Sequence, residues 1–154
     1  MKKHLHLALA LATLFTATPH SIVRAEDGPR LTALQEAEMK LLQGTWEGVE
    51  VGREAGGKCT LTITANTLSF QGGNPGEWYK GTFELPANKD PRQLAGTIKE
   101  CPAEAIIGKT AWAIYKIEDG TLTLVGNPPG SPEPPKTFNG DANSRTFTLK
   151  KAEK

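Results

Sequence analysis

Residues 59–70 read CTLTITANTLSF, and this stretch decides the fold class that the sequence predicts. Apolar residues alternate with threonines before the turn, which is typical of a strand with one buried face. A two-residue turn at 65–66 would pair Ile63 with Leu68 and place the apolar side chains of both strands on one face. A shift of one residue would turn that whole face to solvent, so the pattern specifies the register strongly.

A second hairpin is predicted around Asp119-Gly120. Both residue types tolerate positive φ, which a type I′ turn requires at its two central positions. Across this turn Ile117 pairs with Leu122, while Lys116 points to the opposite face. Both hairpins therefore separate an apolar side from a polar side.

Eight short strands are predicted after residue 44, with no helix between them. They cover residues 45–51, 59–64, 67–70, 77–85, 93–99, 109–118, 121–125 and 145–151. A run of strands without crossover helices predicts an antiparallel all-β fold, which can be a sandwich or an up-and-down barrel.

One amphipathic helix is predicted ahead of the strands, over residues 31–43. The leucines that share one face at helical spacing are Leu34, Leu41 and Leu42. Thr32 and Gln35 have the spacing of a capping box, and Gly44 is a typical terminator.

The predicted loops differ in length between the two ends of an up-and-down arrangement. One end receives the connections 65–66, 86–92 and 119–120, and the other receives 52–58, 71–76, 100–108 and 126–144. The longer loops thus gather at one end, as in a cup. Binding residues often lie on loops that a rigid scaffold holds in place. The segment 126–140 contains five prolines, and we expect a stiff connection rather than a ligand for a proline-recognition module.

Residues 1–25 have the pattern of a secretory signal peptide. A basic start is followed by an apolar run over 5–18 and by small residues before position 26. The alternative is a membrane anchor, but the run is shorter than the roughly 20 apolar residues that a spanning helix needs. We expect cleavage, export to the periplasm or the medium, and no stable membrane insertion afterwards. The expected domains are a leader and helix at 26–43 and a barrel at 44–154.

Composition argues against several classes of function. The chain has 154 residues, with 18 Lys and Arg against 17 Asp and Glu, so it lacks the basic excess typical of nucleic-acid binders. Its three histidines are His4, His6 and His20, so the exported chain would contain none. Nucleophile activation by imidazole and typical zinc sites are then excluded. We expect no enzyme, metal or cofactor, and an enzyme that uses carboxylates is the remaining catalytic alternative.

The two cysteines, Cys59 and Cys101, are predicted to form a disulfide. Both would lie at the long-loop end, and paired cysteines are common in exported domains. The alternative is two buried free thiols.

The motif Gly44-Thr45-Trp46 after a short helix resembles the G-x-W signature of lipocalins, whose tryptophan plugs the closed end of an eight-stranded barrel. The resemblance implies a basic residue packed over that tryptophan, either Arg145 or Lys150. The longer stretch LLQGTWE at 41–47 resembles the opening of a lipocalin-like family of small exported bacterial proteins, abundant in planctomycetes.

Two further stretches are similar to the same family. IYKIEDGTL at 114–122 resembles its "IYxLxGDTL" hairpin, and NPPG at 127–130 resembles its "xPPG" segment. The similarity covers about residues 38–151 and implies an eight-stranded up-and-down barrel and export. The family has no assigned activity, so it supplies no site residues.

Two functions follow from this interpretation. The first is a binding module for a small apolar or amphipathic ligand, with Tyr115 as the best candidate for a polar anchor. The aromatic residues expected inside are Trp46, Phe70, Phe83, Tyr115 and Phe147. The second is a structural or protein-interaction domain with a filled barrel, because eight strands can be filled by side chains alone. In that case we expect Trp78, Trp112 or both to point outward. Outward tryptophans mark either a partner surface or the seat on which the helix packs, and we favour the seat for one of them.

Overall fold

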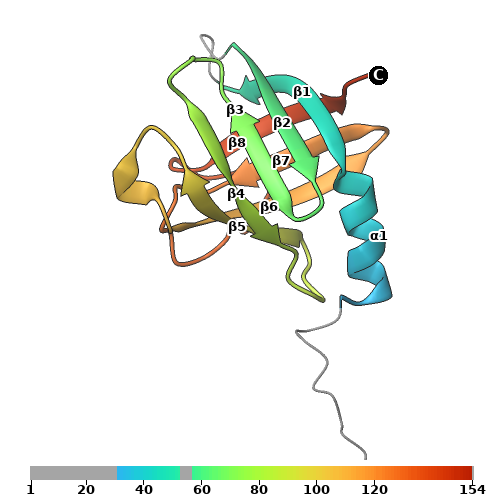
Figure 1. Ribbon diagram of the computed structural model, residues 1–154. Helices are drawn as coiled ribbons and strands as arrows, with labels where there is room; N and C mark the ends of the chain where they lie inside the picture. Colours follow the sequence, from blue (N-terminus) through green and yellow to red (C-terminus); the bar gives the residue numbers. More distant parts are fainter. Residues whose placement is uncertain (1–30, 53–56, 154) are drawn as a thin grey trace, which may run out of the picture. The chain divides into compact units, whose positions relative to one another are not determined.

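The computed structural model describes residues 31–52 and 57–153 (Figure 1). The predicted signal peptide at 1–25 and the leader at 26–30 lie outside the described residues. The elements are α1 (Ala33–Leu42), β1 (Gly44–Val51), β2 (Lys58–Thr64), β3 (Thr67–Gln71), β4 (Trp78–Glu84), β5 (Arg92–Glu100), the 3₁₀ helix η1 (Glu104–Ile106), β6 (Thr110–Glu118), β7 (Thr121–Gly126) and β8 (Arg145–Lys151). Neither described helix has the length and apolar character needed to cross a membrane.

The eight strands form a closed barrel in which each strand pairs antiparallel with the next. β1 pairs with β8 and closes the sheet, so the barrel is the up-and-down type. The predicted registers are confirmed, with Ile63 opposite Leu68 and Ile117 opposite Leu122. Asp119 and Gly120 both have positive φ, 49° and 71°, as the type I′ turn requires.

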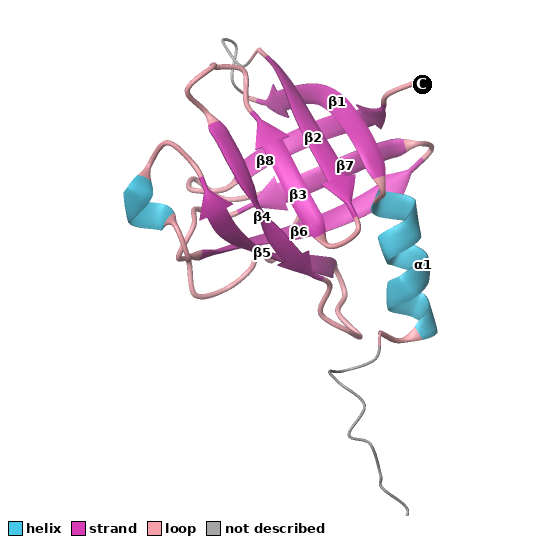
Figure 2. Cartoon of the chain, viewed as in Figure 1, coloured by secondary structure: helices cyan, strands magenta, loops and turns pink. Residues whose placement is uncertain are grey.

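The helix α1 closes the end of the barrel that carries the short turns. Figure 1 shows α1 beside the turns that join β2 to β3 and β6 to β7. The side chain of Gln43 hydrogen-bonds both backbone groups of Ala65 in the first of these turns. The amide of Gln35 donates to the carbonyl of Leu85, which follows β4, at 2.6 Å. Figure 2 shows η1 and several longer loops at the opposite end of the barrel, as the loop lengths predict.

The buried face of α1 differs from the predicted one. Leu34 and Leu41 are 58% and 54% exposed, whereas Glu38 and Leu42 are buried. The helix covers an opening instead of lying along a wall, so only the narrow strip that faces the barrel end is buried. The capping box of Thr32 and Gln35 is confirmed.

A buried carboxylate fastens α1 to the barrel. Glu38 accepts a hydrogen bond from the Tyr115 hydroxyl at 2.9 Å and forms an ion pair with Arg92 at 2.7 Å. Burial, followed by the hydrogen bond to Glu38, raises the pKa of Tyr115, so the hydroxyl keeps its proton and donates.

Trp46 fills the closed end beneath the helix. Its ring is 2% exposed, and its indole N–H donates to the carbonyl of Leu42 at 2.8 Å. The ammonium of Lys151 lies 5.3 Å from the centre of the Trp46 ring. The basic residue over the tryptophan is therefore Lys151, and the expectation of Arg145 or Lys150 is wrong. A buried tryptophan at the closed end with a basic residue over it is the arrangement that the resemblance to lipocalins implies.

The proline-rich connection between β7 and β8 packs against the outside of the barrel. Ile114 and Val125 point away from the interior, yet both are 0% exposed. Pro135 in this connection is itself buried, and an added Cβ at Gly140 would lie 3.7 Å from Val125 Cγ1. The segment is thus a packed cover over β6 and β7 as well as a stiff link.

The predicted disulfide between Cys59 and Cys101 is not formed in the structure, where both residues are buried free thiols. Cys59 lies on β2, and Cys101 follows β5, with β3 and β4 between these strands in the sheet. Neighbouring strands are about 4.8 Å apart, so these strands are separated by more than the Cα distance that a disulfide allows. The Cys101 thiol instead donates to the carbonyl of Ala103 at 3.1 Å.

Thiol titration with Ellman's reagent should show two slow thiols in the folded protein and two fast thiols in guanidinium chloride without reductant. Both side chains are buried, and burial raises the pKa of Cys59, so little reactive thiolate is present near pH 8. Fewer than two thiols in the denatured, unreduced protein would contradict the free-thiol state.

Candidate functional site

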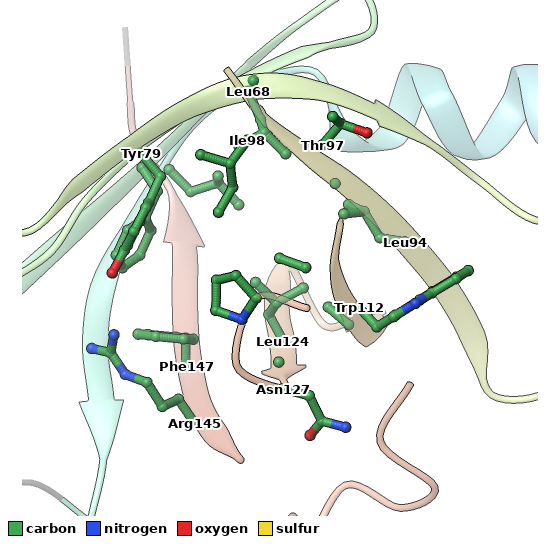
Figure 3. A pocket seen from close by; sticks show the side chains of 18 of the residues that line it. Leu68, Tyr79, Leu94, Thr97, Ile98, Trp112, Leu124, Asn127, Arg145 and Phe147 are labelled. Atoms are coloured by element: carbon green, nitrogen blue, oxygen red, sulfur yellow. The ribbon is translucent and has the colours of Figure 1, made fainter. Parts of the chain in front are cut away.

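A cavity of about 310 Å³ extends from the barrel interior toward the long-loop end (Figure 3). Its inner wall is largely apolar and comes from strands β2 to β8, and residues 127–129 of the proline-rich connection line its outer part. Its lining includes Leu61, Ile63, Leu68, Phe70, Tyr79, Leu94, Ile98, Trp112, Leu124, Asn127, Arg145 and Phe147. The cavity therefore lies where the loop lengths place the mouth of a cup.

Small residues on one side of the barrel leave this space open. Gly96 on β5, Ala111 and Ala113 on β6, and Gly126 on β7 all line the cavity. An added Cβ at Gly96 would meet its nearest neighbours at 3.6–3.7 Å, which is ordinary contact. At Gly81, by contrast, an added Cβ would lie 2.0 Å from the Thr97 carbonyl oxygen, so the strand pairing itself requires glycine there. Gly96 is thus compatible with a larger residue, and its lack of a side chain contributes directly to the cavity.

Aromatic rings form the opposite side. Phe70 on β3 and Phe147 on β8 meet across the interior with ring centres 5.2 Å apart, in an edge-to-face arrangement. Tyr79 stacks on Phe70 at 6.1 Å. β1 contributes no residue to the cavity lining, whereas the strands on both sides of this aromatic contact do.

An ion-pair cluster of Arg145, Glu50 and Glu77 lies at the mouth. The Arg145 guanidinium binds both carboxylate oxygens of Glu50, at 2.8 and 2.6 Å, and also donates to Glu77. It lies 5.1 Å from the centre of the Phe147 ring. The hydrogen bond to Glu50 is the main reason why the pKa of Arg145 is raised, although its partial burial opposes this. The cluster joins β8, β1 and the start of β4 at the rim.

Tyr79 supplies a hydroxyl beside this cluster. Figure 3 shows Tyr79 and Arg145 on one side of the cavity and Trp112 on the other. Burial, followed by the charge of Glu77, raises the pKa of Tyr79, while Arg145 opposes the shift. The hydroxyl therefore stays protonated at neutral pH and is a hydrogen-bond donor at the aromatic side.

The predicted aromatic set is divided between the two ends of the barrel. Phe70 and Phe147 line the cavity, whereas Trp46, Phe83 and Tyr115 are buried and are not part of its lining. The Tyr115 hydroxyl is bonded to Glu38 at the closed end, so it does not reach a ligand in the cavity as the predicted anchor would.

The prediction that Trp78 or Trp112 forms the seat of the helix is also wrong. Trp78 begins β4 and Trp112 lies near the start of β6, so both stand at the long-loop end, away from α1. Trp112 lines the cavity, and the ring of Trp78 lies 5.6 Å from the Lys80 ammonium.

Tyr79, Asn127 and Arg145 line the cavity but are not among the predicted ligand-binding residues, and Arg145 was expected over Trp46 instead. Tyr79 has the same parity as Phe83 on β4, so strand alternation could have found it. Glu50 and Glu77 are 95 and 68 residues from Arg145 in the chain, so no local sequence pattern predicts that the two carboxylates contact its guanidinium. Among the described residues, no cluster of three or more His, Cys, Asp or Glu side chains could hold a metal ion.

No protein-family model matches the chain, and no curated protein matches it. Among solved structures, a variant of the fluorescent protein UnaG is similar, with a TM-score of 0.42 and 12% sequence identity. The match covers 75% of this chain and 99% of that chain.

Proposed function

We propose that this protein is an extracytoplasmic lipocalin-like binding module for a small apolar or amphipathic ligand. The observation that carries the proposal is the apolar cavity of about 310 Å³ beneath the long loops. Its volume lies at the lower end of the range of 300–1,000 Å³ that is common for small-molecule sites. A ligand of modest size with one polar end fits this arrangement.

The cavity favours the binding module over a filled barrel with a purely structural or protein-interaction role. Its apolar lining would bury a ligand's hydrocarbon, which is the main source of affinity in such sites. Export and a non-catalytic role remain part of the proposal, and they rest on the signal-peptide pattern at 1–25 and on the confinement of histidine to that segment.

Titration with the uncharged dye N-phenyl-1-naphthylamine tests the binding function. We expect a saturable, blue-shifted rise in fluorescence with one dye per protein, because the dye enters an apolar, water-poor space. No saturable rise would contradict the proposal and favour the filled barrel.

Native mass spectrometry of the protein purified from its own host provides a second test. A bound molecule that is lost on denaturation would support the binding function directly. The mass of the polypeptide also tests export, since cleavage after Ala25 leaves a chain that begins at Glu26. A mass that includes residues 1–25 would contradict that part of the proposal.

A further inference from the structure

We propose that the hydroxyl of Tyr79 is the polar anchor of the ligand and donates a hydrogen bond to an acceptor oxygen on it, such as a ketone carbonyl. This inference rests on the proposed binding function and names the chemistry of the ligand's polar end. It gives Tyr79 the anchoring role that the sequence predicts for Tyr115.

The two tyrosines of the chain lie at opposite ends of the barrel and differ in their partners. The hydroxyl of Tyr115 donates to Glu38 at the closed end, at 2.9 Å. The hydroxyl of Tyr79 makes no hydrogen bond to any other residue in the described part of the chain. Tyr79 lines the cavity, and its ring stacks on Phe70 with ring centres 6.1 Å apart. Its ring is thus held in place while its hydroxyl is uncommitted.

Tyr79 points into the barrel and stands near the mouth. It is the second residue of β4, which begins at the long-loop end, and it has the same parity as the buried Phe83. Figure 3 shows the hydroxyl at the end of the ring that lies toward Arg145. Within residues 31–52 and 57–153, no fully buried polar side-chain atom lacks a hydrogen-bond partner. The unpartnered Tyr79 hydroxyl is therefore accessible and not sealed in the wall.

Three other polar side chains of the lining are already engaged. The Arg145 guanidinium donates to the two carboxylates of the ion-pair cluster. Asn127 donates to a backbone carbonyl at 3.0 Å and accepts from the Ser144 hydroxyl at 2.8 Å. The ammonium of Lys80 lies 3.6 Å from Glu100, and its side chain is 56% exposed. A ligand would have to compete with protein or solvent for these groups.

The two remaining polar side chains of the lining point away from the cavity. Thr97 follows Gly96 and Trp112 precedes Ala113, so both alternate with residues that point inward. Figure 3 shows the Thr97 hydroxyl and the Trp112 indole directed away from the centre of the cavity. Among the described lining residues, Tyr79 therefore offers the inward-facing polar side-chain group that has no partner.

This arrangement favours a ligand that carries an acceptor oxygen. A ligand in the cavity excludes water from the Tyr79 hydroxyl, and a hydrocarbon at that place would leave the hydroxyl without a partner, which is unfavourable. A carbonyl oxygen removes that cost, because the protonated hydroxyl donates to it. The hydrocarbon of the ligand would extend inward from this point along Phe70 and Phe147.

Competition for bound N-phenyl-1-naphthylamine tests the inference, with 4-phenyl-2-butanone and butylbenzene as matched competitors. The two molecules differ by a carbonyl in place of a methylene group. Butylbenzene partitions into apolar phases more readily, so the decisive measurement is the change in each affinity between variants.

Tyr79→Phe removes the hydroxyl and keeps the ring that stacks on Phe70. We expect this variant to bind the ketone roughly three- to tenfold more weakly, the usual net value of one hydrogen bond. Its affinity for butylbenzene should stay the same or rise. Tyr115→Phe is the matched control, because it removes the hydroxyl that is bonded to Glu38 at the closed end and should leave both affinities unchanged.

Infrared spectroscopy of the bound ketone gives a readout that a merely structural role of Tyr79 would not change. In the unmodified protein we expect the carbonyl band at lower wavenumber than in hexane, because a hydrogen bond weakens the C=O stretch. In Tyr79→Phe the band should return toward its position in hexane.

The inference is overturned if the bound ketone has the hexane-like band in the unmodified protein. It is also overturned if folded Tyr79→Phe binds the ketone as tightly as the unmodified protein does, or loses affinity for ketone and butylbenzene equally. These results differ from a failure of the binding function itself, in which the dye would not bind saturably and neither competitor would bind.

Discussion

Replacement of Gly96 by leucine is expected to abolish saturable binding of N-phenyl-1-naphthylamine while the barrel stays folded. Gly96 lies on β5 and lines the cavity, and a Cβ at this position would make only ordinary contacts, with Ala111, Leu68 and Leu94 as the nearest residues. The rest of the leucine side chain would then occupy the space that the ligand needs. We expect the dissociation constant for the dye to rise at least a hundredfold.

The same substitution should not destabilise the protein. Leucine removes the conformational freedom that glycine gives the unfolded chain, and it buries apolar surface in a void. We expect the free energy of unfolding to rise by about 1 kcal/mol. Urea denaturation followed by circular dichroism measures this change, and it separates a filled cavity from a disrupted barrel.

Ala95→Leu provides the matched control, because it adds hydrophobic volume to the neighbouring residue on the opposite face of β5. Its affinity for the dye should equal that of the unmodified protein. Gly126→Leu fills the cavity from β7, where an added Cβ would lie 3.8 Å from the Trp112 carbonyl oxygen. Unchanged dye binding in both folded filling variants would show that the dye binds elsewhere.

The strands could be predicted to within about one residue because the decisive signals are local. Alternation over 59–70 and the turn at Asp119-Gly120 specify two hairpins, and one-sided burial then determines which face points inward. Closure of the sheet into a barrel could not be derived in this way, because the pairing of β1 with β8 joins distant parts of the chain. The resemblance to lipocalins supplied that step.

The cavity could be predicted only in part, because alternation shows which side chains point inward but not how deep they lie. Trp46, Phe83 and Tyr115 point into the barrel as expected, yet they lie in the filled, closed end. The open part depends on inward positions that carry almost no side chain, such as Gly96 and Gly126. Such positions carry no aromatic or polar side chain that would mark them in the sequence as part of a site.

The buried face of α1 could not be predicted from the sequence, for a different reason. The spacing of Leu34 and Leu41 predicts a buried face, but the element covers a barrel end, and the side chains that attach it include the polar residues Gln35 and Glu38. Helical periodicity assumes that a helix lies along an apolar surface. Because α1 meets the barrel at its rim, backbone carbonyls and charged partners replace part of that surface.

Trp46→Ala is expected to lower the free energy of unfolding by about 3–5 kcal/mol, the usual cost of deleting a large buried aromatic side chain. The ring is 2% exposed, belongs to the main core, and links α1 to the barrel through the Leu42 carbonyl. Its removal also takes away the aromatic surface beneath the Lys151 ammonium. Urea denaturation measures the loss, and Trp78→Ala is the control.

The control should cost far less, because Trp78 is only partly buried at the opposite end and its ring lies against the exposed Lys80. Under conditions in which Trp46→Ala remains folded, its affinity for N-phenyl-1-naphthylamine should match that of the unmodified protein, since Trp46 does not line the cavity. A large loss of dye binding with little loss of stability would instead make Trp46 a ligand contact. The Trp46→Ala variant therefore distinguishes two arrangements of the barrel. In the first, the closed end has a structural role and the ligand binds only at the open end. In the second, the ligand contacts the whole interior.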